Sequence, residues 1–164
     1  WLLLLMVSAT FTGKIIQSYE TALASAVVLT SFIPMLMDTG GNAGSQASVS
    51  IIRGLSLNEI EFKDILKILW KELRVSALIG ATLAVANFIK LITIDHVSMK
   101  IAGVVCGTLV VTVICAKLVG SSLPMLAKKL GFDPAVMASP FITTIIDALS
   151  LIVYFQIASM VLGI

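Results

Sequence analysis

Five long apolar runs follow one another along the chain, and short polar segments separate them. Because an α-helix needs about 20 mostly apolar residues to cross a bilayer, this pattern predicts an all-α membrane protein with five transmembrane helices per chain. The first run is short for a span, and we expect it to begin before residue 1. The runs cover residues 1–16, about 21 into the stretch 32–54, 75–94, 101–127 and 134–164.

A different periodicity fills the segment between the second and third runs, "LSLNEIEFKDILKILWKELR". Ser56 and Glu59 have the spacing of a helix capping box. After them, apolar residues from Phe62 to Leu73 recur at helical intervals, opposite Lys63, Lys67, Lys71 and Arg74. This pattern is typical of an amphipathic helix that lies along the membrane surface with its basic face toward lipid headgroups.

Composition supports the membrane assignment. Hydrophobic residues make up 59% of the chain, charged residues 12%, and mean hydropathy is +1.09. With 164 residues there is no room for a separate soluble domain, so one transmembrane ion-conducting domain is expected over 1–164. The net charge of +2 gives no reason to expect nucleic acid as a partner. Because the chain lacks an initiator methionine, we expect a segment of a longer protein.

The single histidine and the two cysteines do not suggest chemistry. Cys106 and Cys115 are nine residues apart in one run, about 13 Å along a helix and too far for a disulfide. We interpret both as buried thiols. His96 lies beside Asp95 in a loop and is expected to be solvated.

The distribution of basic residues predicts an orientation. Segments on one side of the membrane carry seven lysines and arginines and those on the other side carry three. Because basic loops stay in the cytoplasm, the chain start is predicted to be cytoplasmic and its end outside. The protein would be a multi-pass protein of the cell membrane (inner or plasma membrane), in contact with lipid. Lys117 is expected to extend to the cytoplasmic interface.

The stretch 32–54 interrupts the second run with Asp38, Asn42, Gln46 and several glycines. Pro34, Gly40 and Gly41 are placed to bend or loosen a helix there, and a broken helix at membrane depth must face protein or water. For the glycines alone, a close-packing face with the spacing Gly40-x-x-x-Gly44 is an equally good interpretation. The polar side chains favour a pathway, since a packing face needs no acid.

A second intramembrane acid, Asp147, lies about thirteen residues into the fifth run, near the expected bilayer centre. A lone carboxylate there costs at least about 2.5 kcal/mol, so it must face water, a cation or a partner. Ser139, Thr143 and Asp147 are spaced at i, i+4 and i+8 on one helical face. This polar stripe predicts a pore lining.

The donor types in this lining are carboxylates, hydroxyls, amides and backbone carbonyls, which suit hard cations. One acid per chain cannot strip the water from Mg²⁺, whereas two acids across a twofold axis can hold the hydrated ion. The chemistry therefore predicts a homodimer.

Two stretches carry a family resemblance: "PMLMDTGGNAGSQASVSIIRGL" from Pro34, and "LPMLAKKLGFDPAVMASPFITTIIDALSLIVYF" from Leu123. They resemble the membrane domain of MgtE-type magnesium channels, which are related to animal magnesium carriers. Five spans, an amphipathic helix after the second and a cytoplasmic start also match.

The resemblance implies a homodimer whose pore lies on the twofold axis and is lined by spans two and five. Asp147 would hold hydrated Mg²⁺ from both protomers, and Mn²⁺ or Co²⁺ are further candidate ions. Ser139 stands where the family often has Asn. Asp133 would bind regulatory Mg²⁺ at the cytoplasmic mouth, and cytoplasmic regulatory domains would precede this segment. Asp38 adds negative potential, and the remaining pore-lining candidates are Gly40, Gly41, Asn42, Gln46 and Thr143.

Three other functions are weaker alternatives. A cation-coupled secondary transporter of divalent metals also uses broken helices with midplane acids, although no internal inverted repeat is evident. The Asp-Thr-Gly in "MDTG" lacks the second copy that an aspartic protease needs, so we expect no enzyme. A plain membrane anchor would leave both acids unexplained.

Overall fold

The computed structural model describes residues 2–135 and 140–163, and every regular element in that part of the chain is helical. The all-α prediction is therefore confirmed. The elements are α1 (Leu2–Ser18), α2 (Glu20–Ser25), the 3-10 helix η1 (Val27–Phe32), α3 (Ile33–Ser56), the 3-10 helix η2 (Phe62–Asp64), α4 (Ile65–Thr93), α5 (Met99–Lys129) and α6 (Pro140–Leu162).

Among the described residues, three helical segments are long and apolar enough to cross a membrane: Phe62–Thr93, Met99–Lys129 and Pro140–Leu162. They overlap the third, fourth and fifth predicted spans, of which the fifth was predicted over 134–164. Helix α1 has 17 residues, and α3 carries the polar stretch that begins at Asp38. Spans one and two, and hence the count of five, stay predictions.

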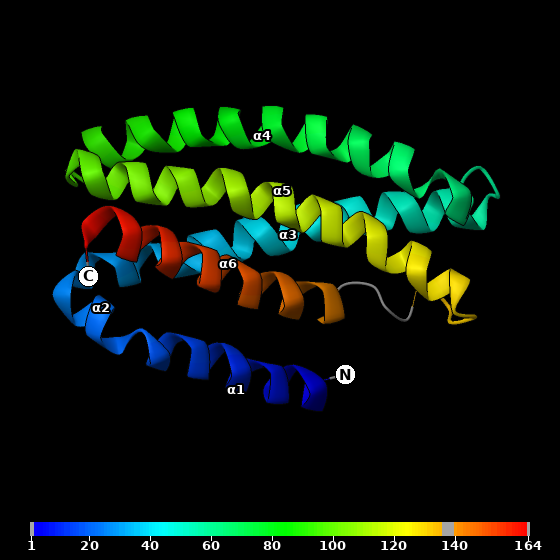
Figure 1. The fold of residues 1–164 in the computed structure, drawn as a ribbon, viewed down its shortest axis with the longest axis horizontal. Coiled ribbons are helices and arrows are strands. Elements are labelled where there is room, and N and C mark those ends of the chain that lie inside the picture. Colours follow the sequence, from blue (N-terminus) through cyan, green and yellow to red (C-terminus); the bar gives the residue numbers. More distant parts are fainter. Residues whose placement is uncertain (1, 136–139, 164) are drawn as a thin grey trace.

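The helices run along a common long axis, with α5 beside α4, α3 and α6 (Figure 1). Helix α1 lies at the opposite edge from α4 and packs on α6. The largest core cluster joins α3, α5 and α6 around Tyr154 and Phe155, both fully buried. The Tyr154 hydroxyl donates a hydrogen bond of 2.9 Å to the carbonyl of Leu29 in η1. This bond satisfies a backbone acceptor where the regular helix has been interrupted.

The predicted separate amphipathic helix is wrong. Its residues form η2 and then the first turns of α4, which continues without a break to Thr93. No proline or glycine occurs in α4 before Gly80, so nothing in the sequence ends the helix between the amphipathic and apolar parts.

The predicted capping box is also misplaced. Ser56 is the last residue of α3, and its hydroxyl donates to the carbonyl of Ile52 at 2.9 Å. The observed capping box pairs Glu61 with Asp64, whose Oδ2 accepts from the Glu61 amide at 3.1 Å.

Helix α3 is not broken at its glycines. Pro34 lies in the first turn of α3, where a proline is tolerated, and the helix runs unbroken through Gly40 and Gly41. The interruption comes earlier, at Ala26, where φ is −144° and ψ is 70° between α2 and η1. The prediction of a helix broken at the glycines is therefore wrong.

The packing interpretation explains two of the glycines. A Cβ on Gly40 would lie 2.8 Å from Cγ2 of Thr112 on α5 and 2.9 Å from Cγ2 of Ile146 on α6. A Cβ on Gly44 would collide with Ile146, and the backbone of Gly44 lies directly against Gly120 of α5. The missing side chains let three helices approach closely.

Three smaller predictions concern single side chains. The ammonium of Lys117 lies 3.7 Å from the Glu72 carboxylate of α4, and both side chains are largely buried, so its extension to the cytoplasmic interface stays a prediction. The two partners are 45 residues apart, which is why the pair was not predicted. Neither Cys106 nor Cys115 forms a disulfide, as predicted, but only Cys106 is buried, and Cys115 is half-buried. His96 is exposed in the α4–α5 loop, as predicted.

Candidate ion-binding groove

A groove of about 460 Å³ lies between α3 and α6. Five of the predicted site residues line it: Asp38, Gly41 and Asn42 from α3, and Thr143 and Asp147 from α6. Ile33, Pro34 and Met37 complete the lining. The two intramembrane acids, 109 residues apart in the sequence, therefore face one space.

The antiparallel packing of α3 and α6 brings these residues together. Gly40 approaches Ile146 and Ser150, whereas Gly44, one turn later on α3, approaches Ile142, one turn earlier on α6. In this register Asp38 lies level with Asp147, and Asn42 lies level with Thr143. The groove thus has a level of carboxylates and, one turn along, a level of amide and hydroxyl.

The local helix geometry presents these groups to the groove. Asp38 and Asn42 are one turn apart on α3 and exposed, while Gly40 and Gly44 face the helical core. Thr143 donates its hydroxyl to the Pro140 carbonyl at 3.1 Å, so its oxygen lone pairs can accept from water in the groove. Asp147 lies seven residues after Pro140, which is nearer to the described helix start than predicted.

The charge of the groove is uncompensated. No lysine, arginine or histidine is among its lining residues. Lys117, the base within the span of α5, is paired with Glu72 on the far side of α5 from this groove. Two carboxylates with no basic partner at membrane depth favour a bound cation.

The donor set indicates which cations fit. The groove offers carboxylate, amide and hydroxyl oxygens, which are ligands for hard cations such as Mg²⁺. Within residues 2–135 and 140–163 there is no cluster of three or more histidine, cysteine, aspartate or glutamate side chains.

Three predicted residues do not line the groove, and a fourth was not described. Gly40 is buried behind it, and Gln46 is exposed further along α3. Asp133 is exposed in the α5–α6 connection, where its Oδ1 accepts from the Ala135 amide at 2.9 Å. Ser139 lies outside the described residues.

The sequence reasoning missed two apolar lining residues, Ile33 and Met37, and gave Pro34 only a bending role. Their signal was present in the helical spacing. Pro34 precedes Asp38 by four residues, and Met37 precedes Gly41 by four, so they share the groove face of α3.

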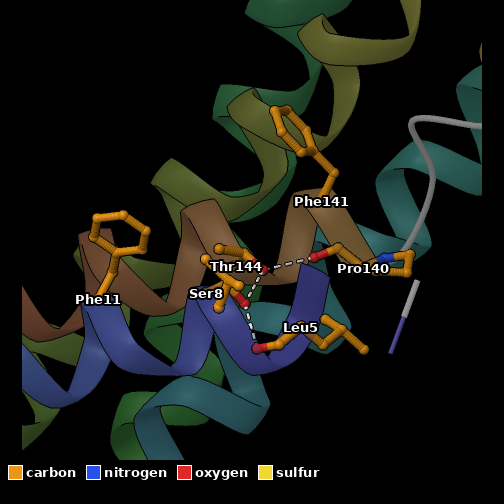
Figure 2. Close-up of a pocket in the computed structure, with 7 residues that line it drawn as sticks. Leu5, Ser8, Phe11, Pro140, Phe141 and Thr144 are labelled. Atoms are coloured by element: carbon orange, nitrogen blue, oxygen red, sulfur yellow. Dashed lines mark hydrogen bonds between the residues drawn. The ribbon is translucent and has the colours of Figure 1, made fainter. Parts of the chain in front are cut away.

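A second cavity, of about 270 Å³, lies between α1 and α6. Figure 2 shows residues that line it, which are Leu5, Ser8 and Phe11 of α1 and Pro140, Phe141 and Thr144 of α6. The Thr144 hydroxyl lies 3.1 Å from the Ser8 hydroxyl and 2.8 Å from the Pro140 carbonyl. The hydrogen bond between Thr144 and Ser8 connects α1 to α6, next to Thr143. Because the cavity has no ionisable lining, it is not a candidate ion site.

The fold and the groove together define a helical membrane protein with an acidic, oxygen-lined site between two of its helices. The MgtE family model, described as divalent cation transporter, matches residues 33–157. The chain belongs to this family, as its sequence motifs predicted.

Curated relatives match along nearly the whole chain. The magnesium transporter MgtE of Thermus thermophilus is 34% identical over 163 residues, which is 99% of this chain and 36% of the relative. The magnesium transporter MgtE of Bacillus subtilis is 38% identical over 160 residues, or 97% of this chain and 35% of the relative. The Enterococcus faecalis protein of the same name is 33% identical, covering 98% and 35%. The chain thus spans about a third of the length of these relatives.

Proposed function

We propose that this chain forms the ion path of a Mg²⁺ transporter, in which two copies face each other across a twofold axis with the α3–α6 groove of each on that axis. The observation that carries the proposal is the pair Asp38 and Asp147 in one groove with no basic partner. The family and the names of the relatives supply the ion, since each of those proteins is named a magnesium transporter.

The proposed mechanism depends on charge and hydration. Four carboxylates from two copies attract a divalent cation about twice as strongly as a monovalent one at the same distance, because Coulomb energy scales with ion charge. Mg²⁺ gives up its water reluctantly, so the carboxylates, Asn42 and Thr143 accept hydrogen bonds from its water shell. Selection then depends on the size of the hydrated ion. Asp147 is the central ligand in this proposal, and Asp38 adds negative potential beside it.

The second copy is part of the proposal because one chain leaves polar side chains uncovered. Asp38, Asn42 and Gln46 recur every fourth residue along α3, and all three are exposed. Lipid cannot satisfy such groups, whereas a water-filled path between two copies can. We place the chain start and the α3–α4 and α5–α6 connections in the cytoplasm. Asp133 would then lie at the cytoplasmic mouth, and regulatory domains would precede α1.

One observation favours a second candidate, a transporter coupled to a proton or sodium gradient. The regular helix before the groove is interrupted between α2 and α3, where η1 has 3-10 geometry. Interrupted helices beside a binding site are common in secondary transporters.

Flux into liposomes separates the two candidates. Full-length protein is reconstituted around a Mg²⁺-sensitive dye, the voltage is clamped, and Mg²⁺ uptake is measured with and without a proton or sodium gradient. A channel gives uptake that follows the Mg²⁺ electrochemical gradient alone. Uptake that requires the second gradient supports the coupled transporter, and no Mg²⁺ uptake in any condition contradicts both. Adding Mn²⁺, Co²⁺ or Ca²⁺ as competitors ranks the ions.

A further inference from the structure

A third groove, of about 420 Å³, runs between α4 and α5. It lies near the end of the bundle where α5 terminates in Lys128 and Lys129. Its α4 wall is apolar, and the α5 wall adds Leu118, Val119 and one hydroxyl, that of Ser122. The α4 side chains are those of Leu66, Leu69, Trp70 and Leu73.

This groove faces outward. Trp70 is 58% exposed and Leu66 is 78% exposed. Only 17% of the most apolar part of α4 is buried by the rest of the chain, compared with 50% for α5. Helix α4 also lies at an edge of the bundle, beside α5 alone among the long helices (Figure 1).

A stripe of free positive charge borders the groove. Lys67, Lys71 and Arg74 are exposed and spaced at i, i+4 and i+7, so they lie on one side of α4. The guanidinium carbon of Arg74 is 5.6 Å from the centroid of the Trp70 ring, which places this charge at the groove edge. Within the described residues none of the three forms an ion pair, whereas Lys63 is paired with Glu61 at 2.8 Å.

The sequence also fixes the depth of this stripe. Arg74 is the last charged residue before the uncharged segment 75–89 of α4. Residues 66–74 therefore lie at the membrane interface, with Arg74 the deepest of the three charges and Trp70 at the level that tryptophan prefers in membrane proteins. The apolar groove and the basic stripe lie side by side at the depth where an acyl chain meets its phosphate.

We propose that the α4–α5 groove binds one anionic phospholipid of the surrounding bilayer. Its phosphate and anionic headgroup contact Lys67, Lys71 and the long side chain of Arg74, and the upper part of its acyl chain lies against Trp70 and Leu73. Basic clusters on amphipathic helices and between membrane helices recognise anionic headgroups in this way. The site is separate from the ion groove, which α3 and α6 form, and does not depend on the transport mechanism.

The test uses the fluorescence of Trp70. In the full-length protein, every tryptophan except Trp70 is replaced by phenylalanine, including Trp1. This protein is placed in phosphatidylcholine nanodiscs that contain a small fraction of phosphatidylglycerol brominated on its acyl chain. Bromine quenches tryptophan only on contact. We expect much stronger quenching than with the same fraction of brominated phosphatidylcholine, because the groove concentrates the anionic lipid.

Variants test the charge. In Lys71→Gln and Arg74→Gln we expect about fivefold more brominated phosphatidylglycerol to be needed for half-maximal quenching, the effect of one basic residue near an anionic lipid. Lys71→Gln leaves the Arg74–Trp70 contact intact and keeps the test valid if Arg74→Gln changes the tryptophan itself. The matched control is Lys100→Gln, an exposed lysine at the opposite end of α5, which should leave quenching unchanged.

Two results would overturn the proposal. Equal quenching by both brominated lipids would mean that the groove contacts bulk lipid without selecting charge. Absence of quenching by either lipid would mean that another protein surface, from a second copy or another part of the full-length chain, covers Trp70.

Discussion

Asp147 is the residue whose charge the proposed function needs most, since it lines the groove on the helix opposite Asp38. Asp147→Asn preserves its shape and removes one negative charge per copy. We expect Mg²⁺ flux to fall about tenfold or more, the effect of about 1.4 kcal/mol on the free-energy barrier that limits flux. Monovalent cations should pass through the pore of this variant, because divalent ions no longer bind tightly enough to block them. Flux in liposomes and single-channel recording measure both effects.

The control for this substitution is Asp95→Asn. Asp95 is a loop residue paired with Lys90 at 2.6 Å, and it does not line the groove. Its replacement should leave Mg²⁺ flux unchanged. If Asp147→Asn kept both wild-type flux and wild-type competition by Ca²⁺, the central site would have been assigned to the wrong acid.

Gly41 offers a test of the groove volume. A Cβ there would lie 3.4 Å from Cγ2 of Thr143, an ordinary contact, and because Gly41 lines the groove we expect a larger side chain to extend into it. Gly41→Leu should therefore lower Mg²⁺ flux by about tenfold or more while leaving expression and thermal stability near wild type. Normal conduction by this variant would place the narrow part of the path elsewhere.

At Gly120, unlike Gly41, we expect a substitution to lower stability, because the helices are closely packed there. A Cβ on Gly120 would collide with the backbone of Gly44, which cannot move aside as a flexible side chain can. We expect Gly120→Ala to destabilise the protein by about 1–3 kcal/mol, the usual cost of overpacking. The control is Gly107→Ala on the same helix, where a Cβ would meet no atom within 4 Å. Thermal unfolding monitored by size-exclusion chromatography compares the two, and equal melting temperatures would contradict the packing explanation.

At the level of helices, the ion pair between Lys117 and Glu72 joins α4 to α5. Lys117→Met should destabilise the protein by up to about 3 kcal/mol, because it leaves the largely buried Glu72 carboxylate without a counter-charge. Adding Glu72→Gln should recover most of that loss. A double-mutant cycle by thermal unfolding measures the coupling, and additive losses would mean that the pair contributes no coupling.

The helices also show what the sequence can and cannot predict. Apolar run lengths predicted α4, α5 and α6 because a membrane span must be long and apolar. The amphipathic period of residues 62–74 was correct as well, yet period alone does not reveal whether a helix ends before the next one begins. Here α4 continues because no residue interrupts it. Gly40 and Gly44 were equally compatible with a bend and with packing, since the difference lies in helices α5 and α6, more than sixty residues away.

The same distinction holds for the site. Asp38, Asn42, Thr143 and Asp147 could be selected from the sequence because polar side chains are costly in apolar spans. Their common groove follows from the antiparallel register of α3 and α6, which the close approach at Gly40 and Gly44 fixes. Neither that register nor the Lys117–Glu72 pair can be obtained from local spacing, because both depend on contacts between distant segments.

For the whole molecule, the central prediction is a dimer with the two grooves facing each other. One chain has Asp38, Asn42 and Gln46 exposed along α3, and an intramembrane aspartate without water or a partner costs at least about 2.5 kcal/mol. A second copy related by a twofold axis would bring each α3–α6 groove against its equivalent and enclose a polar path. Helix α4 would then remain on the outside, in contact with lipid.

Cysteine cross-linking tests this arrangement. In full-length protein without other cysteines, including Cys106 and Cys115, a cysteine at Thr143 should form a disulfide-linked dimer in membranes, because equivalent positions beside a twofold axis approach each other. A cysteine at Ala86 on the exposed side of α4 is the matched control and should remain monomeric under the same oxidation. Mg²⁺ should slow the cross-linking at Thr143, since the hydrated ion occupies the space between the two grooves. A cross-link at Ala86 but not at Thr143 would place the dimer interface on α4. The acidic groove of each copy would then face lipid instead of the second copy, and the proposed ion path between the two grooves would be wrong.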